Sequence, residues 1–232
     1  MRLVVWNCHQ GLDKKAELLA DLRPDIAIVP ECANPLLPKL ASVLSKCGVT
    51  QSAWNGSNQQ KGLGVFIFNN AVKAESIETL GGKFSIKIDL DLAEKVSLIA
   101  VWTQNPGYIE EAHKTVETYK KSLNERNVIF AGDFNSNKIW DSSRTLNHTA
   151  LVDRLKNEFG LESAYHHHFG EDQGQEKRAT LYFTYNEKKP YHIDYVFIPQ
   201  KWLSKIKAVH VGEFKNWKHV SDHCPLVLEI DI

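Results

Sequence analysis

Long apolar runs are absent from this sequence. No segment reaches the ~18 consecutive apolar residues that a membrane-spanning helix needs. The apolar run that follows Met1 is also too short for a signal peptide. We therefore expect a cytoplasmic protein that has no membrane partner.

The sequence also lacks cysteine pairs at metal-binding spacing, and it has no net charge. The cysteines form no C-x-x-C pair, which argues against a zinc knuckle and a disulfide framework, so we expect four free thiols, Cys8, Cys32, Cys47 and Cys224. Lys and Arg total 28, as do Asp and Glu, and the formal net charge is therefore zero. Without an overall basic field, a polyanion would have to be held locally.

Apolar segments of strand length alternate with amphipathic helices along residues 1–232, and no linker-like segment divides them. A strand at 3–7, a helix of about ten residues that Asp13 can cap and Pro24 ends, and a strand at 25–29 make a βαβ-like opening, whose two strands should lie side by side. Asn7 and Glu31 would then share one edge of a sheet. We predict a single α/β domain over 1–232, with sheet in the middle and helices outside.

Turn residues and periodicity predict the remaining elements. Helices are expected at 34–46, 109–123 and 146–159. The polar segment 161–177 is interpreted as a long surface loop, and its three adjacent histidines favour a solvated loop over a metal site because adjacent rings diverge. Further strands are expected at 64–69, 71–79, 84–90, 96–103, 127–131, 180–185, 193–198, 206–211 and 226–230.

Polar motifs stand at the ends of the apolar strands. Taken singly, such residues more often cap helices or start turns. Taken together, four carboxylates and two carboxamides would be costly to gather unless a hard cation or strong donors offset them. The motifs are Trp6-Asn7, Pro30-Glu31, Gly132-Asp133-Phe134-Asn135, Ile193-Asp194-Tyr195 and Ser221-Asp222-His223.

The only histidine in these motifs is His223. It lies just before Pro225, which keeps it out of a helix interior. One acid, Asp222, adjoins it in sequence, and Asp194 opens a neighbouring strand. This is the arrangement that holds an imidazole in a chosen tautomer.

In this order and with these neighbours, the motifs resemble those of the endonuclease/exonuclease/phosphatase (DNase I-like) superfamily. The resemblance runs from Leu3 to Leu228 and is most specific in Gly-Asp-Phe-Asn at 132–135 and Ser-Asp-His-Cys-Pro at 221–225. It implies a four-layered α-β-β-α sandwich, with two central mixed sheets flanked by helices.

Roles at the site are also implied by the resemblance. Glu31 would be the principal ligand of a Mg²⁺ ion, for which Mn²⁺ is a possible substitute, with Asn7 beside it and Asp222 assisting. The catalytic residues would be Asp133, which orients or deprotonates the attacking water, Asn135, which binds the scissile phosphate, and His223, which donates to a phosphate oxygen while Asp194 fixes its other nitrogen.

The segment Val101-Trp102-Thr103-Gln104-Asn105 departs from the family, whose members place a tyrosine or a histidine here. This departure speaks against the abasic-site repair group. Trp102 and Asn105 are candidate substrate contacts, although Trp102 is equally typical of core. Thr180 and His192 are further candidate contacts, and for His192 a structural role has equal weight. A basic rim is predicted from Lys61, Lys138, Arg144, Lys215 and Lys218.

We predict a Mg²⁺-dependent phosphodiesterase, most simply a nuclease that hydrolyses DNA or RNA by water attack. We expect nucleic acid as its partner, no obligate protein partner, and a monomer. One alternative is a phosphatase or a lipid phosphodiesterase of the same superfamily. Another is a non-catalytic nucleic-acid-binding relative, against which the full set of acids, amides and histidine argues.

Overall fold

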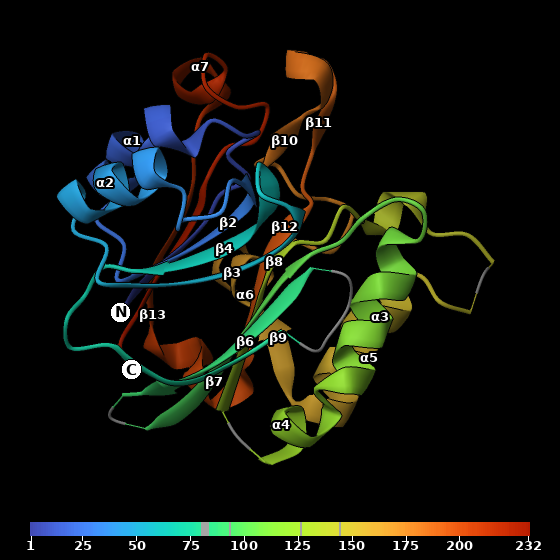
Figure 1. Cartoon of the computed structure of the whole chain (residues 1–232). Coiled ribbons are helices and arrows are strands. Elements are labelled where there is room, and N and C mark those ends of the chain that lie inside the picture. Colours follow the sequence, from blue (N-terminus) through green and yellow to red (C-terminus); the bar gives the residue numbers. More distant parts are fainter. Residues whose placement is uncertain (80–83, 93, 126, 144) are drawn as a thin grey trace.

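Two six-stranded sheets face each other at the centre of the molecule (Figure 1). The computed structural model describes residues 1–79, 84–92, 94–125, 127–143 and 145–232. The first sheet has the order β13 (Ile206–Val211), β14 (Leu226–Ile230), β1 (Arg2–Val5), β2 (Ile26–Cys32), β4 (Lys61–Ile67), β3 (Gln51–Asn58). The second has the order β5 (Lys73–Glu78), β6 (Ser85–Asp91), β7 (Lys95–Trp102), β8 (Asn127–Asp133), β12 (Asp194–Pro199), β9 (Leu161–Ser163).

Helices cover the outer face of each sheet (Figure 1). On the first sheet lie α1 (Ala16–Asp21) and α2 (Pro38–Lys46), and on the second lie α3 (Tyr108–Thr118), α4 (Lys120–Glu125) and α5 (His148–Phe159). The predicted four-layered sandwich is confirmed. Smaller elements are η1 (Leu12–Lys14), η2 (Lys138–Trp140), α6 (Ala164–Phe169), β10 (Leu181–Tyr182), η3 (Phe183–Tyr185), β11 (Pro190–Tyr191), η4 (Gln200–Lys205) and α7 (Phe214–Trp217).

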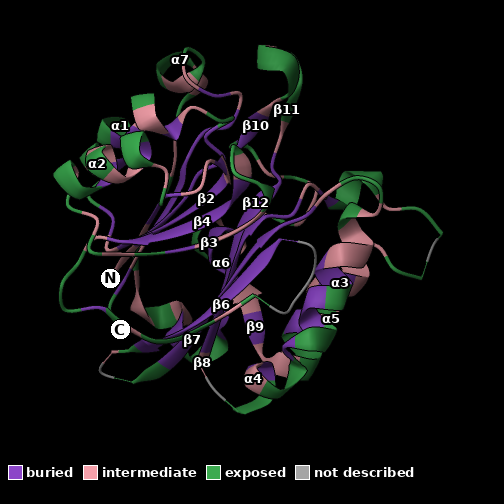
Figure 2. Ribbon diagram, viewed as in Figure 1, coloured by how far each residue is buried: buried purple, intermediate pink, exposed green. Residues whose placement is uncertain are grey.

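Three apolar cores hold the four layers together. Side chains alternate along a strand, so Leu3 and Val5 of β1 enter the core between the sheets, whereas Val4 packs under α1 and α2. A third core joins the second sheet to α3 and α5, where Val116 and Leu151 lie. Figure 2 shows the result, since the strands are largely buried and the helices are exposed on their outer faces.

Strand direction brings the polar motifs to one edge. β1 and β2 are parallel, as predicted, so Asn7 and Glu31 follow or end neighbouring strands on the same side. β8 and β12 are antiparallel, and Asp133, the last residue of β8, is the register partner of Asp194, the first of β12. The ends of two sheets therefore meet at the residues that the sequence singled out.

Several predicted elements were wrong. Residues 161–169 form β9 and α6 rather than a surface loop, because Ala164 and Tyr165 are buried in the core between the sheets. The predicted helix 109–123 is divided at Tyr119 into α3 and α4. The polar edge strand β3 was missed.

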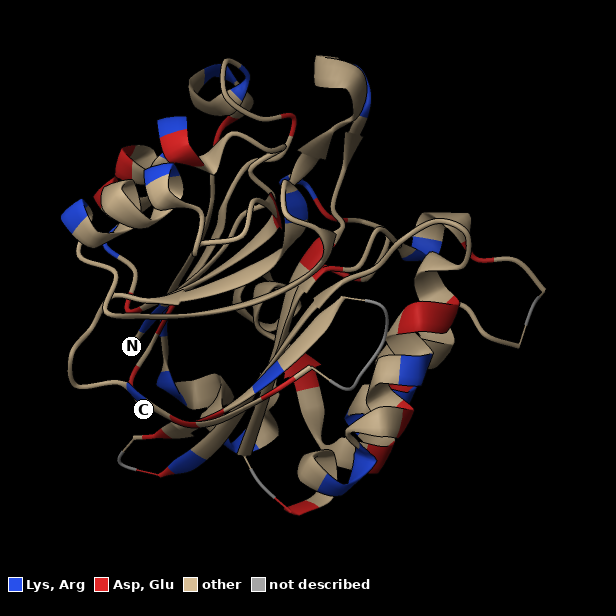
Figure 3. Cartoon of the chain, viewed as in Figure 1, with Lys and Arg blue, Asp and Glu red and all other residues tan. Residues whose placement is uncertain are grey.

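Surface features agree with the composition. Along α3, α4 and α5, basic and acidic residues are interspersed (Figure 3), as a net charge of zero leads one to expect. Among the residues that the structure describes, no helix is both long enough and apolar enough to cross a membrane.

Gly132 is required by the pairing of β7 with β8. Its φ is 145°, and a Cβ at this position would lie 1.9 Å from the Val101 carbonyl oxygen. Gly160 also has a positive φ, 64°, but a Cβ there meets nothing within 4 Å.

We expect Gly132→Ala to lower the free energy of unfolding by more than about 4 kcal/mol, since the backbone of β7 would have to move. Gly160→Ala, the matched control, should cost roughly 1–2 kcal/mol, from backbone strain alone. Urea denaturation measures both. Equal costs for the two variants would show that the close approach to Val101 is relieved without loss of pairing.

Candidate active site

Residues from both sheets make direct contact at the shared edge. The Asn7 amide, after β1, donates to Asp133 Oδ2 at 3.0 Å and lies 3.4 Å from Glu31 Oε1. A ring nitrogen of His223, Nδ1, donates to Asp194 Oδ2 at 3.0 Å. The structure thus brings together the predicted residues 7, 31, 133, 194 and 223, which lie up to 216 positions apart in the sequence, the separation of residues 7 and 223.

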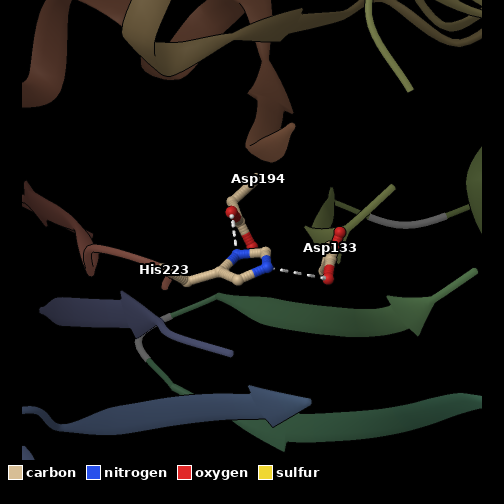
Figure 4. Close-up of side chains that lie close together, drawn as sticks. All are labelled: Asp133, Asp194 and His223. Carbon is tan, nitrogen blue, oxygen red and sulfur yellow. Dashed lines mark hydrogen bonds and ion pairs between the residues drawn. The ribbon is translucent and has the colours of Figure 1, made fainter. Parts of the chain in front are cut away.

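His223 lies between two buried carboxylates (Figure 4). Its second ring nitrogen, Nε2, is 4.0 Å from Asp133 Oδ2, which is too long for a hydrogen bond. Burial disfavours the charged ring, but the charge and hydrogen bond of Asp194 and the charge of Asp133 outweigh it and raise the pKa of His223 to about 9. The ring is therefore doubly protonated and positively charged at neutral pH.

Asp133 is the more unusual acid. Burial and the neighbouring charge of Asp194 raise its pKa to about 7, against the opposing effects of His223 and the Asn7 amide. Its other oxygen, Oδ1, accepts the backbone N–H of Asn135 at 2.9 Å. A carboxylate oriented on both oxygens, with a pKa near neutrality, is suited to exchange a proton with water.

Hydrogen bonds between two side-chain hydroxyls and the backbone fix the residues around the ring. Ser221 Oγ donates to the Asn7 carbonyl at 2.8 Å and accepts from the His223 N–H at 3.0 Å, which ties the loop before β14 to β1. The Thr180 hydroxyl accepts from the N–H groups of Ile193 and Asp194 at 3.0 and 3.1 Å. Thr180 is fully buried, and its hydroxyl positions Asp194.

Glu31 is held beside a lysine. β2 bulges against β4 between Val29 and Cys32, and within this bulge Glu31 has a φ of 61°. Its Oε2 lies 3.0 Å from Lys61 Nζ, and the ammonium lies 5.3 Å from the centre of the Trp102 ring. Lys61 was predicted only as part of a basic rim, and the structure gives it a direct contact with the acidic centre.

Two other predicted rim residues contact groups outside the acidic centre. Lys215 pairs with Glu213, and the ammonium of Lys218 lies over the Phe214 ring. Arg144 is outside the described residues.

The acids beside Glu31 suit a hard cation. Asp222 Oδ1 is buried and, within the described part of the chain, accepts no hydrogen bond, although His9 Nδ1 lies 3.2 Å away. The charges of Asp222 and Glu31 both affect the pKa values of Tyr185 and Lys15. Carboxylate oxygens, one of them without a hydrogen bond, fit a Mg²⁺-like ion. The Asn7 amide turns its nitrogen toward Glu31, and its oxygen accepts the His9 N–H at 3.0 Å.

Asp133, Asp194 and His223 are a second group with metal-ligating atoms, all within 4.8 Å of one another. Here both ring nitrogens face carboxylates, and a protonated imidazole already offsets part of their charge. Asp194 Oδ1 is also buried without a hydrogen bond among the described residues. A cation bound there would have to displace the imidazolium, so the Glu31 side fits a cation better than the His223 side does.

Three of the four predicted substrate contacts are buried. Thr180 is 0% exposed, and its hydroxyl is hydrogen-bonded to the backbone of Ile193 and Asp194. Trp102 is 3% exposed and packs against Phe84, with ring centroids 5.0 Å apart. His192 is also 3% exposed, and its Nδ1 lies 2.8 Å from the Arg178 carbonyl. Asn105 is exposed, in the loop before α3. Trp102 bears on the site through Lys61.

Two tyrosines on which the acids act were not among the predicted site residues. Burial and the charges of Asp133 and Glu31 raise the pKa of Tyr108, while burial and the charges of Asp222 and Glu31 raise that of Tyr185. Tyr108 starts α3 and Tyr185 ends η3, so each reaches the centre from a loop that no strand pattern predicts. Their phenols are donors that could meet an anionic substrate.

Asp194→Asn should return the pKa of His223 from about 9 toward the ordinary histidine value of ~6.5. Because the folded-state pKa is raised, the stabilising contribution of His223 is fully present below ~6.5 and is lost as pH rises to about 9. The wild-type free energy of unfolding should therefore fall over this interval, and that of the variant should fall less.

NMR titration of the imidazole and urea denaturation at both ends of the interval measure these quantities. The exposed ring of His210 serves as an internal control whose NMR signals should be the same in the wild type and the variant. An unchanged pKa of His223 in the variant would mean that Asp194 is not the source of the shift.

Comparison with known proteins gives similarity in structure but not in sequence. No family model matches the chain, and no curated protein matches it by sequence. Solved structures match it over 100% of both chains. A 3′ phosphatase from Neisseria bound to a product DNA hairpin has 16% identity and a TM-score of 0.74, and a 3′–5′ exonuclease from Neisseria meningitidis has 16% and 0.72. An AP endonuclease from Archaeoglobus fulgidus has 15% and 0.73.

These similarities confirm the predicted resemblance at the level of the fold. Two mixed six-stranded sheets, covered on both sides by helices, carry the polar motifs at one shared edge. The chain has the DNase I-like α/β sandwich fold of these exonuclease, endonuclease and phosphatase structures.

Proposed function

We propose that this protein is a divalent-cation-dependent phosphodiesterase that hydrolyses nucleic acid by attack of water at phosphorus. One observation supports the proposal most: a buried Asp133–His223–Asp194 group faces Asn7 and Glu31 across the edges of two sheets. Support also comes from the solved structures of this fold, which include a 3′ phosphatase bound to product DNA and a 3′–5′ exonuclease.

In this mechanism Asp133 takes the proton of the attacking water. The Asn7 amide and the Asn135 N–H orient its two oxygens, and its pKa of about 7 allows it to accept a proton and later release it. The gap of 4.0 Å between Asp133 and His223 Nε2 leaves that N–H able to donate to a phosphate oxygen. Asp194 holds the ring by its other nitrogen.

Glu31, Asp222 and Asn7 would hold the cation. When bound there, such an ion supplies positive charge to the phosphate oxygens as negative charge builds on them. Lys61, 3.0 Å from Glu31, offsets part of the negative charge of this group. Neither role requires a covalent nucleophile, and positioned charge is what phosphoryl transfer needs.

We expect Glu31→Gln to lower the rate of phosphodiester hydrolysis at least ~10²-fold, because a carboxylate on the ion is lost. Affinity for Mn²⁺, measured from the free-ion signal by electron paramagnetic resonance, should fall with it. Glu17→Gln, on the exposed face of α1, is the matched control and should change neither. Full activity of Glu31→Gln on every cleaved substrate would contradict the proposed role of Glu31.

The substrate is tested by a panel with EDTA controls. Plasmid, single-stranded DNA, RNA, DNA with a 3′ phosphate and a phosphoinositide cover the nuclease, phosphatase and lipid alternatives. We expect cleavage of a nucleic acid that EDTA stops and that Mg²⁺ or Mn²⁺ restores. Binding of nucleic acid without turnover in either ion would favour a non-catalytic relative instead.

A further inference from the structure

Three successive residues in the loop after β1 have a positive φ. The angle is 49° at His9, 63° at Gln10 and 62° at Gly11. A side chain disfavours this left-handed conformation, because its Cβ comes too close to the carbonyl oxygen that follows. Glycine adopts it without this cost, whereas His9 and Gln10 keep it only where other contacts hold them there.

Lys15 supplies contacts that hold this loop. Its ammonium donates to the carbonyl oxygen of Cys8 at 2.6 Å and to that of Gln10 at 2.8 Å, and it lies 3.5 Å from that of His9. Hydrogen bonds from a charged donor are shorter and stronger than those between neutral groups. Among the described residues this ammonium bonds to carbonyl oxygens of the loop and to no carboxylate.

The loop places two groups of His9 against the candidate active site. The backbone N–H donates to Asn7 Oδ1 at 3.0 Å, so the NH₂ group of that amide is left toward Asp133 and Glu31. The ring nitrogen Nδ1 lies 3.2 Å from Asp222 Oδ1. The shape of the loop therefore affects side chains on both sides of the acidic centre.

The His9 N–H decides which way the Asn7 amide points. The two ends of a carboxamide have nearly the same shape, but only the nitrogen end donates. If the oxygen end faced Asp133, the hydrogen bond of 3.0 Å would be replaced by two acceptors in contact. Asp133 would then keep only the Asn135 N–H of the two donors that orient its oxygens.

We propose that Lys15 is a positioning residue for hydrolysis at this site. Its ammonium holds residues 8–10 in the shape that presents the His9 N–H to Asn7, and the Asn7 amide in turn orients Asp133. The inference rests on the proposed function and adds to it a residue that acts only through the backbone. A displacement of about 1 Å that begins far from the reacting atoms can cost roughly 10²-fold in rate.

Lys15→Ala tests the proposal on the nucleic acid that the wild type cleaves. We expect kcat to fall at least ~10-fold and KM to change less than about twofold, because orientation and not binding is lost. n-Propylammonium in the buffer should restore most of the lost rate. Tetramethylammonium, which is charged but has no N–H to donate, should restore none. Lys14→Ala, at the exposed neighbouring lysine, is the matched control and should keep the wild-type kinetics.

Hydrogen exchange of the His9 amide in the metal-free protein is the second measurement. It should be at least ~10-fold faster in Lys15→Ala, while exchange of the Val4 amide, within β1, stays at the wild-type rate. Lys15→Gln, which keeps one donor group, should lie between the wild type and Lys15→Ala in both measurements.

Equal rescue by the two cations would show that Lys15 acts through its charge alone, and it would overturn the inference. Unchanged exchange at His9, or a wild-type kcat in Lys15→Ala, would do the same. Faster exchange at both His9 and Val4 would assign Lys15 a structural role in β1 instead. In these cases the proposed function stands, because the wild type still hydrolyses nucleic acid. No hydrolysis of any substrate in the panel by the wild type would overturn both.

Discussion

The positive charge of the doubly protonated His223 ring, which lies between Asp133 and Asp194, is the interaction on which the site depends. The two aspartates are register partners on adjacent strands of the second sheet, and both are buried. Burial of each charge costs several kcal/mol in lost hydration. Two unpaired carboxylates side by side would also repel each other. The compensating positive charge is that of His223, in the loop before β14 of the first sheet. Charge balance therefore joins the edges of both sheets at this point.

The same charge balance divides the site into two sides with different chemistry. On the His223 side the imidazolium is hydrogen-bonded to Asp194 and lies 4.0 Å from Asp133, and a cation there would have to displace it. On the Glu31 side, Asp222 keeps a buried oxygen without a hydrogen bond, and Lys61 offsets only part of the charge. Asn7 donates to Asp133 and lies 3.4 Å from Glu31, and so connects the two sides. In this account Asp133 and His223 carry out proton transfer and donation, and Glu31 and Asp222 hold the cation. The Asn7 amide contacts both groups.

Local rules in the sequence predicted an α/β domain and the neighbouring strands of Asn7 and Glu31, while the family resemblance implied the sandwich and the convergence of the distant motifs. Apolar strands that end in Asn7 and Glu31 are parallel neighbours, and Asp194 opens a strand as its β-branched and aromatic successors require. The features that the sequence did not predict depend on contacts between residues far apart in the chain. His166 was assigned to a solvated loop, yet in α6 it is largely buried against Glu176. The contact of Lys61 with Glu31 follows from a bulge in β2, and the approach of Tyr108 and Tyr185 follows from loop geometry, none of which leaves a periodic signal.

Anomalous scattering from Mn²⁺ in crystals of the protein tests this division of the site most directly. We expect the strongest peak within coordination distance of a Glu31 carboxylate oxygen, with Asp222 facing it and the His223 ring still bonded to Asp194. A peak between Asp133 and Asp194, with the His223 ring displaced, would contradict the account, because the buried aspartates would then be balanced by metal and not by a proton.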